Sequence, residues 1–265
     1  MIIIYRFLKS LLDKIFALIG IIIFMPLIII LSIAVAIDSK GPAIFLQERV
    51  GKGGKLFKMV KFRTMRTTGI PFDINNPVIE DDNQNLTKVG RFIRRFKLDE
   101  FLQLFNVLKG DMNFIGPRPL LPVYMEQYQP WEKEKFKLKP GMSGLAQVNG
   151  NGHLLGVERS YYDVLYIKKE NPFTDLGIVL KTVAVVFGGE EKYIKRVDDA
   201  QLDEVRTEFE LTGKISRKKF KMPSNAGVNT ENVDKGANGL QKTDGNAVGQ
   251  NAENNADGSK SAEGE

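Results

Sequence analysis

The segment Ile15–Ile37 has the sequence IFALIGIIIFMPLIIILSIAVAI, which carries no charge and is long enough to cross the hydrocarbon core of a bilayer as a straight helix. It is too long for a cleaved signal peptide, and no small-residue cleavage site follows it. Pro26 lies near its middle, where a proline removes one helical hydrogen bond and kinks the helix. The segment is therefore expected either to cross the membrane or to enter it and turn back at Pro26.

Basic residues flank this segment on both sides, so the positive-inside rule gives no single orientation for a spanning helix. They are Arg6, Lys9 and Lys14 before it and Lys40, Arg49, Lys52 and Lys55 after it. A helix that turns back at Pro26 would keep both flanks on the cytoplasmic side, whereas a single span with a tolerated proline is the commoner arrangement. From the residues alone, both topologies stay open.

The composition restricts the chemistry that the chain can use. Its 265 residues carry a formal net charge of +6 and have a pI near 9.3, which suits an anionic ligand or surface, such as a nucleotide diphosphate or phospholipid. The absence of cysteine excludes disulfides, thiol chemistry and thiolate metal sites. His153 is the only histidine and is expected at the surface. Acid–base and nucleophilic chemistry therefore falls to carboxylates, with Mg²⁺ as a suitable cation.

A second segment, Arg91–Pro119, has the sequence RFIRRFKLDEFLQLFNVLKGDMNFIGPRP and joins a cationic cluster to a carboxylate pair and a rigid turn. Arg91, Arg94 and Arg95 have the i, i+3, i+4 spacing that places side chains on one helix face. By itself such a face is usually only solvated, and Gly116–Pro119 by itself would be a stiff connection. The combination is more informative than either part.

Asp99 and Glu100 fall at the expected start of the next helix, where the helix dipole and free N–H groups favour anions. That helix is expected to end at Gly110. Its predicted apolar stripe consists of Leu98, Phe101, Leu102, Phe105 and Leu108. An isolated Asp in this position is more often an N-cap than a catalytic group. Cations, carboxylates and a helix start in one place are nevertheless what chemistry on a phosphate group requires.

Two strands are expected at Ala43–Val50 and Leu56–Met65, joined by the glycine-rich turn Gly51–Lys55. The turn lacks the Walker spacing and a Ser or Thr after its lysine, so a hairpin explains it better than a phosphate-binding loop. Lys61 and Arg63 alternate on one face of the second strand, from which they could reach a phosphate.

The rest of the chain alternates expected helices with polar segments. The expected elements are a loop at Thr67–Leu86, a surface helix at Tyr124–Leu138, a turn at Lys139–Gly144, a helix at Glu158–Lys169 and an amphipathic helix, suited to the membrane interface, at Asp175–Phe187. From Lys221 to Glu265 the sequence is rich in Asn, Gly, Ala and charge and has almost no large apolar residue, which is typical of a disordered tail.

Several motifs, in this order after the proline-broken apolar segment, resemble those of the monotopic phosphoglycosyl transferase family of bacterial sugar transferases. The chain is most similar to the small form, which consists of little more than the catalytic domain. The motifs are Val60–Met65 (VKFRTM), Leu98–Glu100 (LDE), Gln103–Met112 (QLFNVLKGDM), Gly116–Pro119 (GPRP) and Pro140–Gly150 (PGMSGLAQVNG). The resemblance covers about residues 10–190.

The resemblance implies transfer of a sugar-1-phosphate from a UDP-sugar to a polyprenyl phosphate such as undecaprenyl phosphate, with release of UMP and dependence on Mg²⁺. It implies an enzyme of the bacterial inner membrane, in contact with membrane lipids and not with nucleic acid, whose catalytic domain faces the cytosol. A re-entrant helix with its bend at Met25 and Pro26 would keep it on the cytoplasmic leaflet. The reaction would start a surface glycan or glycoprotein, such as an exopolysaccharide, capsule or O-antigen, and downstream glycosyltransferases would be among its partners.

The resemblance also implies roles for individual residues. Asp99 would be the nucleophile of a phosphosugar-aspartyl intermediate, Glu100 a metal ligand or acid–base partner, and both would hold the Mg²⁺. The substrate-binding residues would be Lys61, Arg94, Arg118, Pro119, Gln147 and Asn149.

This sequence departs from the family pattern at two positions. Met25 stands where related sequences commonly have Ser before the proline, so no hydroxyl is available there for a freed carbonyl. Asn151 stands where many relatives have Arg, which removes a contact to phosphate or sugar and leaves the donor specificity open.

The expected fold is α+β and helix-rich: a monotopic membrane protein with an N-terminal proline-broken re-entrant helix, a small β-hairpin and interfacial amphipathic helices. Residues 1–40 would form the membrane region, 41–200 the cytosolic catalytic domain, 201–220 a C-terminal extension and 221–265 the disordered tail. Two alternatives stay open. One is the same transfer by direct displacement in a ternary complex, and the other is a non-enzymatic, basic, membrane-anchored scaffold that binds lipid head groups or nucleic acid. The scaffold would keep its binding after loss of Asp99, whereas the enzyme requires that residue.

Overall fold

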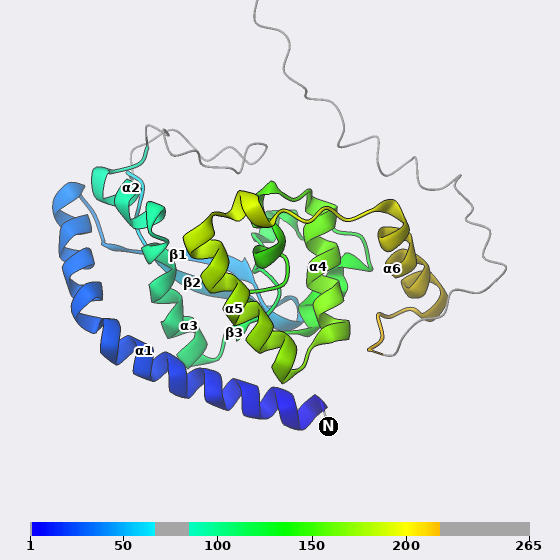
Figure 1. Ribbon diagram of the computed structural model, residues 1–265. Coiled ribbons are helices and arrows are strands. Elements are labelled where there is room, and N and C mark those ends of the chain that lie inside the picture. Colours follow the sequence, from blue (N-terminus) through cyan, green and yellow to red (C-terminus); the bar gives the residue numbers. More distant parts are fainter. Residues whose placement is uncertain (1, 67–84, 218–265) are drawn as a thin grey trace, which may run out of the picture. The chain divides into compact units, whose positions relative to one another are not determined.

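Helices account for most of the structure, a computed structural model that describes residues 2–66 and 85–217 (Figure 1). The strands form two sheets of two strands each. The described part therefore has the predicted helix-rich α+β composition. The predicted tail and nearly all of the predicted polar loop that starts at residue 67 lie outside the described residues.

The apolar N-terminal segment forms one long helix, α1 (Ile2–Asp38), which contains Pro26 and changes direction along its length in Figure 1. It is the one helix among the described residues that is long and apolar enough to cross a membrane. One side of it packs on the rest of the protein, where Ala17 and Ile21 join the same apolar cluster as Leu104. Most of its large apolar side chains are exposed.

The start of α1 is fixed by a buried lysine. The Lys9 ammonium donates hydrogen bonds to the carbonyl oxygen of Ile115 at 2.8 Å, to the hydroxyl of Tyr166 at 2.7 Å and to Oδ2 of Asp175 at 2.5 Å. A buried ammonium without partners would cost several kcal/mol, so these three acceptors explain how it is tolerated. They also hold the first turns of α1 against residues more than one hundred positions later in the chain.

The carboxyl end of α1 is fixed by Arg63, which was predicted to share a strand face with Lys61. That prediction is wrong, because the strand ends at Phe62 and the Arg63 side chain is buried elsewhere. Its guanidinium donates to the carbonyl oxygen of Val35 in the last turn of α1 at 3.4 Å, and to those of Ser39 and Lys40 just after the helix at 2.6 and 2.7 Å. The backbone carbonyls at the end of α1 need such donors, since no further helical turn supplies them.

The predicted β-hairpin is present. β1 (Ile44–Val50) pairs antiparallel with β2 (Leu56–Phe62), and Phe45 lies opposite Lys61. A short 3₁₀ turn, η1 (Lys52–Gly54), connects the strands, and both of its glycines have positive φ angles, 69° and 78°. The glycine-rich sequence thus serves the backbone of the turn, as the hairpin interpretation requires.

The cationic segment forms α2 (Lys88–Arg95), and the carboxylate pair lies in the next element, the 3₁₀ helix η2 (Leu98–Leu102). η2 continues into α3 (Gln103–Lys109), which ends as predicted at Gly110 with a φ of 94°. Asp99 and Glu100 are therefore at the start of this helical unit, as predicted, although that start is a 3₁₀ helix and not an α-helix.

The predicted apolar stripe is only partly buried. Phe105 is exposed, whereas Leu104, Asn106 and Val107 of α3 are buried. Because η2 has three residues per turn, the side chains after it are rotated relative to a helix of 3.6 residues per turn. Asn106 is buried because its amide bridges two backbone groups of β2, accepting from the N–H of Val60 at 2.9 Å and donating to the carbonyl of Lys58 at 2.8 Å.

Two very short strands were not predicted. β3 (Asn113–Ile115) and β4 (Gly141–Ser143) pair in parallel and bring the GPRP segment beside the PGMSG segment. A Cβ atom on Gly141 would lie 2.1 Å from the backbone nitrogen of Gly116, so this close approach requires glycine.

The predicted surface helix at residues 124–138 is wrong. The structure has two short 3₁₀ turns in this region, η3 (Pro122–Tyr124) and η4 (Glu132–Lys137). Trp131 and Lys135 are buried, not exposed. Pro130, in the middle of the segment, has no N–H to continue a helix.

The remaining helices agree with the sequence in position. α4 (Gly156–Lys169) and α5 (Pro172–Gly188) include the two predicted helices. After η7 (Glu190–Tyr193), α6 (Asp199–Thr212) packs on α4 through the apolar cluster that contains Leu202 and Val205. α6 runs across the predicted domain boundary at residues 200 and 201.

Candidate active site

Four of the predicted site residues lie within electrostatic range of one another. Asp99 and Glu100 come from η2, Lys61 from β2, and Arg118 from the GPRP turn after β3. The charges of Asp99, Glu100 and Arg118 all act on the ammonium of Lys61. The amide of Asn106, which fastens α3 to β2, explains why η2 and Lys61 are held together. The site therefore brings cations and carboxylates together.

The carboxylate pair is crowded. Burial, together with the negative charge of Asp99, raises the pKa of Glu100, while Arg118, Lys61 and Lys97 act in the opposite direction. A cation close to both oxygens of such a pair stabilises the ionised form of the two carboxylates, because it offsets their mutual repulsion.

Lys61 is crowded by cations. Burial lowers its pKa to about 8, and the positive charges of Arg49 and Arg118 add to that effect, while Asp99 and Glu100 oppose it. This ammonium is repelled by neighbouring cations and has lost much of its hydration. A multiply charged anion bound beside it would offset both of these unfavourable terms.

Arg49 belongs to this site, although the sequence suggested for it only a role in membrane orientation. Burial lowers its pKa to about 10, and Arg118 adds to the shift. Its Nη1 donates to the carbonyl oxygen of Pro119 at 3.2 Å, and its Nη2 donates to Gln47 at 2.7 Å. Because Arg49 lies four positions after the strand partner of Lys61, the period of two in a strand was the signal that could have found it.

The backbone of the GPRP turn is fixed by buried groups. Oδ1 of Asp163 accepts the backbone N–H of Arg118 at 3.3 Å, and its other oxygen pairs with Lys135 at 3.4 Å. Pro117 accepts the N–H of Gly141 at 2.9 Å. The guanidinium of Arg118 is exposed, and within the described residues it has no hydrogen-bond or ion-pair partner. A fixed backbone with a free guanidinium is an arrangement suited to gripping a phosphate.

A third carboxylate, which sequence reasoning missed, lies at the edge of the site. Glu190 of η7 pairs with Lys97 at 2.5 Å, and Asn151 donates to both Glu190 oxygens at 3.2 Å. Burial alone would raise the pKa of Glu190, but the Lys97 and Asn151 contacts and the charge of Arg118 lower it. Lys97 has a left-handed backbone with a φ of 55°, immediately before the carboxylate pair. Asn151, noted only as a missing arginine, thus helps to hold Glu190 in place.

Arg94, Gln147 and Asn149 make contacts within the protein. Nε of Arg94 donates to the hydroxyl of Thr64 at 3.2 Å. Gln147, in η5 (Gln147–Asn149), donates to the carbonyl of Met142 at 3.3 Å, and Asn149 donates to the carbonyl of Leu145 and accepts from Lys181, both at 2.7 Å. None of these contacts joins them to Asp99 or Glu100. Their substrate-binding roles stay predictions.

The donor set near Asp99 and Glu100 is suited to Mg²⁺. Among the described residues, no group of three or more His, Cys, Asp or Glu side chains could hold a metal ion. Mg²⁺ usually takes only one or two carboxylates from the protein, with water and substrate phosphates completing its octahedron. The adjacent carboxylates, with their mutual repulsion, therefore fit such a partial site.

Comparison with known proteins decides the family. The family model for bacterial sugar transferases matches residues 4–189. The chain belongs to the bacterial sugar transferase family. The match includes η2, the GPRP turn, α4 and α5, and thus every element described above as part of the candidate site except η7.

Three curated relatives of this family member are undecaprenyl-phosphate transferases by name. It is 36% identical over 199 residues to the UDP-N-acetylgalactosamine-undecaprenyl-phosphate N-acetylgalactosaminephosphotransferase of Aeromonas hydrophila. This match covers 70% of this chain and 45% of that protein. It is 38% identical over 201 residues to the undecaprenyl-phosphate galactose phosphotransferase of Salmonella typhimurium, covering 71% and 42%. It is 36% identical over 193 residues to the UDP-glucose:undecaprenyl-phosphate glucose-1-phosphate transferase of Caulobacter vibrioides, covering 70% and 72%. The matches span less than half the length of the first two relatives.

Proposed function

We propose that this protein transfers a sugar-1-phosphate from a UDP-sugar to undecaprenyl phosphate or a related polyprenyl phosphate, and releases UMP. The observation that carries the proposal is the carboxylate pair Asp99–Glu100 beside Lys61 and Arg118, with Arg49 next to these two cations. The names of the relatives support the donor and acceptor classes. The lipid-linked sugar would be the starting point of a surface glycan such as an exopolysaccharide or capsule, and downstream glycosyltransferases would extend it.

The charges in the site favour a reaction in two steps. A carboxylate oxygen of Asp99 attacks the phosphorus that bears the sugar, the bond to the UMP oxygen breaks, and UMP leaves with the electron pair. An oxygen of the lipid phosphate then attacks the same phosphorus, and the carboxylate of Asp99 is released. Because the two phosphate substrates repel each other, departure of UMP before the lipid reacts removes one anion from the site.

The cations would act on the phosphates throughout. Lys61 and Arg118 are placed to offset charge on the transferring group and on the departing UMP, and Arg49 keeps the GPRP turn in position. Asp99 and Glu100 are the residues that would hold Mg²⁺, which when bound would offset further charge on the phosphate oxygens. Glu100 would be the metal ligand or acid–base partner beside the nucleophile.

A monotopic position on the cytoplasmic face of the inner membrane accounts for the contacts of α1. A straight helix of this length would extend about 55 Å at 1.5 Å per residue, so a spanning form would place its two ends on opposite sides of the membrane. Lys9 near one end and Arg63 at the other contact the same compact unit, which supports a helix that bends at Met25 and Pro26 and returns. The exposed apolar side chains of α1 within residues 15–37, and those of α5, would contact lipid.

The proposal is tested by measuring UMP release from a panel of UDP-sugars in the presence of undecaprenyl phosphate. The Asp99→Asn variant should release no more than a trace of UMP while keeping its circular dichroism spectrum, because Asn fits the same turn but cannot act as the nucleophile. If the folded variant retains substantial UMP release, Asp99 is not the nucleophile. Absence of UMP release by wild type with every donor would favour a membrane-anchored scaffold instead.

The same assay without the lipid distinguishes the two-step mechanism from direct displacement. A covalent intermediate lets the enzyme release about one UMP per protein before the acceptor is added. Direct displacement in a ternary complex gives none until the acceptor is present.

A further inference from the structure

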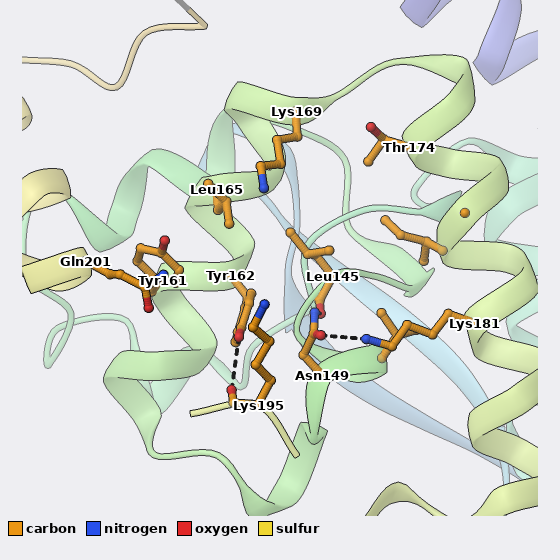
Figure 2. A pocket seen from close by; sticks show the side chains of 13 residues that line it. Leu145, Asn149, Tyr161, Tyr162, Leu165, Lys169, Thr174, Lys181, Lys195 and Gln201 are labelled. Carbon is orange, nitrogen blue, oxygen red and sulfur yellow. Dashed lines mark hydrogen bonds between the residues drawn. The ribbon is translucent and has the colours of Figure 1, made fainter. Parts of the chain in front are cut away.

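A cavity of about 310 Å³ is lined by residues of η5, α4, α5 and α6, by Leu145 and by the segment after η7, and it differs in composition from the candidate active site (Figure 2). Its lining includes Lys169 at the end of α4, Lys181 on α5 and Lys195 after η7, and no Asp or Glu. Within the described residues none of these three lysines forms an ion pair. The cavity therefore has a positive charge that nothing in its lining neutralises.

The three ammonium groups face the same space. Figure 2 shows the nitrogen ends of Lys169, Lys181 and Lys195 directed inward from different elements, beside the ring of Tyr162. Lys181 is held by its 2.7 Å hydrogen bond to Asn149, and the Tyr162 hydroxyl donates to the carbonyl of Lys195 at 2.9 Å. Burial and the charge of Lys195 lower the pKa of Lys181, so the two cations repel each other across the cavity. An anion placed between them would remove that repulsion.

We propose that this cavity binds a small, water-soluble phosphate ester of about the size of a mononucleotide, at a second site separate from the carboxylate pair. Three ammonium groups more than offset the charge of about −2 on a phosphate monoester, and the volume is at the lower end of the range for small-molecule sites. Tyr161 and Tyr162 add aromatic surface for a ring. None of Lys61, Asp99 and Arg118 lines the cavity, whereas Asn149, one of the predicted substrate-binding residues, does.

A soluble ligand fits better than a lipid head group because of the orientation of α5. Its cavity-lining residues Thr174, Ile178 and Lys181 have the i, i+4, i+7 spacing of one helix face. The exposed apolar residues Leu176 and Val183 lie on the opposite face, at roughly 170° by helical rotation. Lipid would meet α5 on its apolar face, away from the lysines.

The two sites share neighbouring segments, so the experiment must separate them. The N–H of Lys195 donates to the carbonyl of Asn149 at 2.9 Å, and two residues further on Asn151 contacts Glu190 at the edge of the active site. UMP is also the proposed product. Binding is therefore measured on the full chain with Asp99→Asn and Arg118→Ala together, which prevents turnover and weakens binding at the active site, so that the result does not depend on the proposed reaction.

The test is calorimetric titration of that protein with UMP and with inorganic phosphate. Lys169→Gln with Lys195→Gln should weaken binding by at least about tenfold, since two charge-assisted hydrogen bonds are lost. The matched control, Lys133→Gln with Lys192→Gln, removes the same charge from exposed lysines outside the cavity and should leave the affinity unchanged. Thermal unfolding of each variant shows that it is folded.

Other outcomes would overturn the proposal. Equal affinities in the cavity variant and the control would place the phosphate elsewhere. No binding of UMP or phosphate to the parent protein would mean that the cavity takes no such ligand. If the cavity variant loses affinity only for phosphatidylglycerol vesicles, with phosphatidylcholine vesicles as reference, the occupant is a lipid head group and the soluble-ligand proposal is wrong.

Discussion

At the scale of single residues, the charged form of Lys61 lowers the free energy of unfolding of the protein. Its folded pKa of about 8 lies below its ordinary value of 10.5, mainly through burial and secondarily through Arg49. Between these two pH values the unfolded chain binds more protons than the folded one, so this contribution to the free energy of unfolding rises with pH in that window. At neutral pH the charged Lys61 destabilises the fold, as functional groups often do.

Because the charged form of Lys61 is proposed to bind phosphate, kcat/KM for the UDP-sugar should fall as the pH rises through about 8. Lys61→Arg should move this alkaline limb to higher pH, since a guanidinium stays protonated there. If the alkaline limb of the kcat/KM profile stays at the same pH in Lys61→Arg, the group that titrates is not Lys61. Lys61→Met should lose activity yet raise the unfolding temperature at pH 7, by roughly 2–4 °C for each kcal/mol of stability regained.

The proposed role of Arg118 depends on the planar geometry of its guanidinium as well as on its charge. Its backbone is held by Asp163 while its guanidinium is exposed, so it can present two parallel N–H donors to a phosphate. Arg118→Ala should reduce kcat/KM by at least about tenfold, as expected for one charge-assisted contact. Arg118→Lys should recover only part of that loss, because an ammonium is a point charge. Full recovery by lysine would show that charge alone is sufficient.

At the scale of elements, the parts that the sequence predicted well are those with local signals. The β-hairpin follows from strand alternation around a glycine turn, and α4 and α5 follow from their apolar periodicity and the Asn171–Pro172 boundary. The stop of α3 follows from Gly110, which has the left-handed backbone that glycine permits. Each of these signals lies within a few residues of the feature that it predicts.

The parts that could not be predicted depend on partners far away in the chain. Lys97 meets Glu190 after 93 residues, and no local pattern marks either residue as a partner of the other. Arg63 follows the alternation of its strand in sequence, but the carbonyls at the end of α1 determine where its side chain lies. For the site, the pair Asp99–Glu100 was visible from its motif, whereas Arg49 and Glu190 became visible only when the elements were packed.

α6 is predicted to be part of the stable unit and not an accessory extension. After it, Ile215 is buried and its N–H donates to Glu134 at 3.0 Å, while the Arg217 guanidinium donates to the carbonyl of Glu170. A chain ending at Lys221 should therefore keep wild-type activity and unfolding temperature, because it retains these contacts. The tail that it lacks has too little apolar content to add stability.

A chain ending at Thr212 should be less stable, since loss of the buried Ile215 side chain alone removes about 1.5–3 kcal/mol. Differential scanning fluorimetry of the two truncated proteins beside the full chain measures the difference. Equal unfolding temperatures for all three would show that the contacts after α6 contribute nothing. A loss of activity in the chain that ends at Lys221 would instead reveal a role for the tail.

At the scale of the whole molecule, the membrane topology can be decided with introduced cysteines, because the chain has none of its own. Lys9, although well placed in sequence, is unsuitable for replacement because its ammonium has three internal acceptors. Ile3, which is 78% exposed, and Lys52, which is exposed, are better positions. In intact cells a membrane-impermeant thiol reagent should label neither cysteine, and it should label both after the cells are opened.

Labelling of position 3 from outside, with position 52 protected, would mean that α1 spans the membrane. Pro26→Leu should shift the protein towards that pattern and reduce activity, because it restores the helical N–H that the proline lacks.

The anchoring of Lys9 also has a consequence for the time at which the chain is made. Its carboxylate partner, Asp175, follows it by 166 residues. At translation rates of 5–20 residues per second, the ribosome adds Asp175 on the order of 10–30 s after Lys9. During that interval α1 is already synthesised, but its ammonium has no counter-charge and must stay in water or at the lipid head groups. The apolar helix therefore cannot settle into its final position until most of the catalytic unit has emerged, which makes its docking a late event in biogenesis.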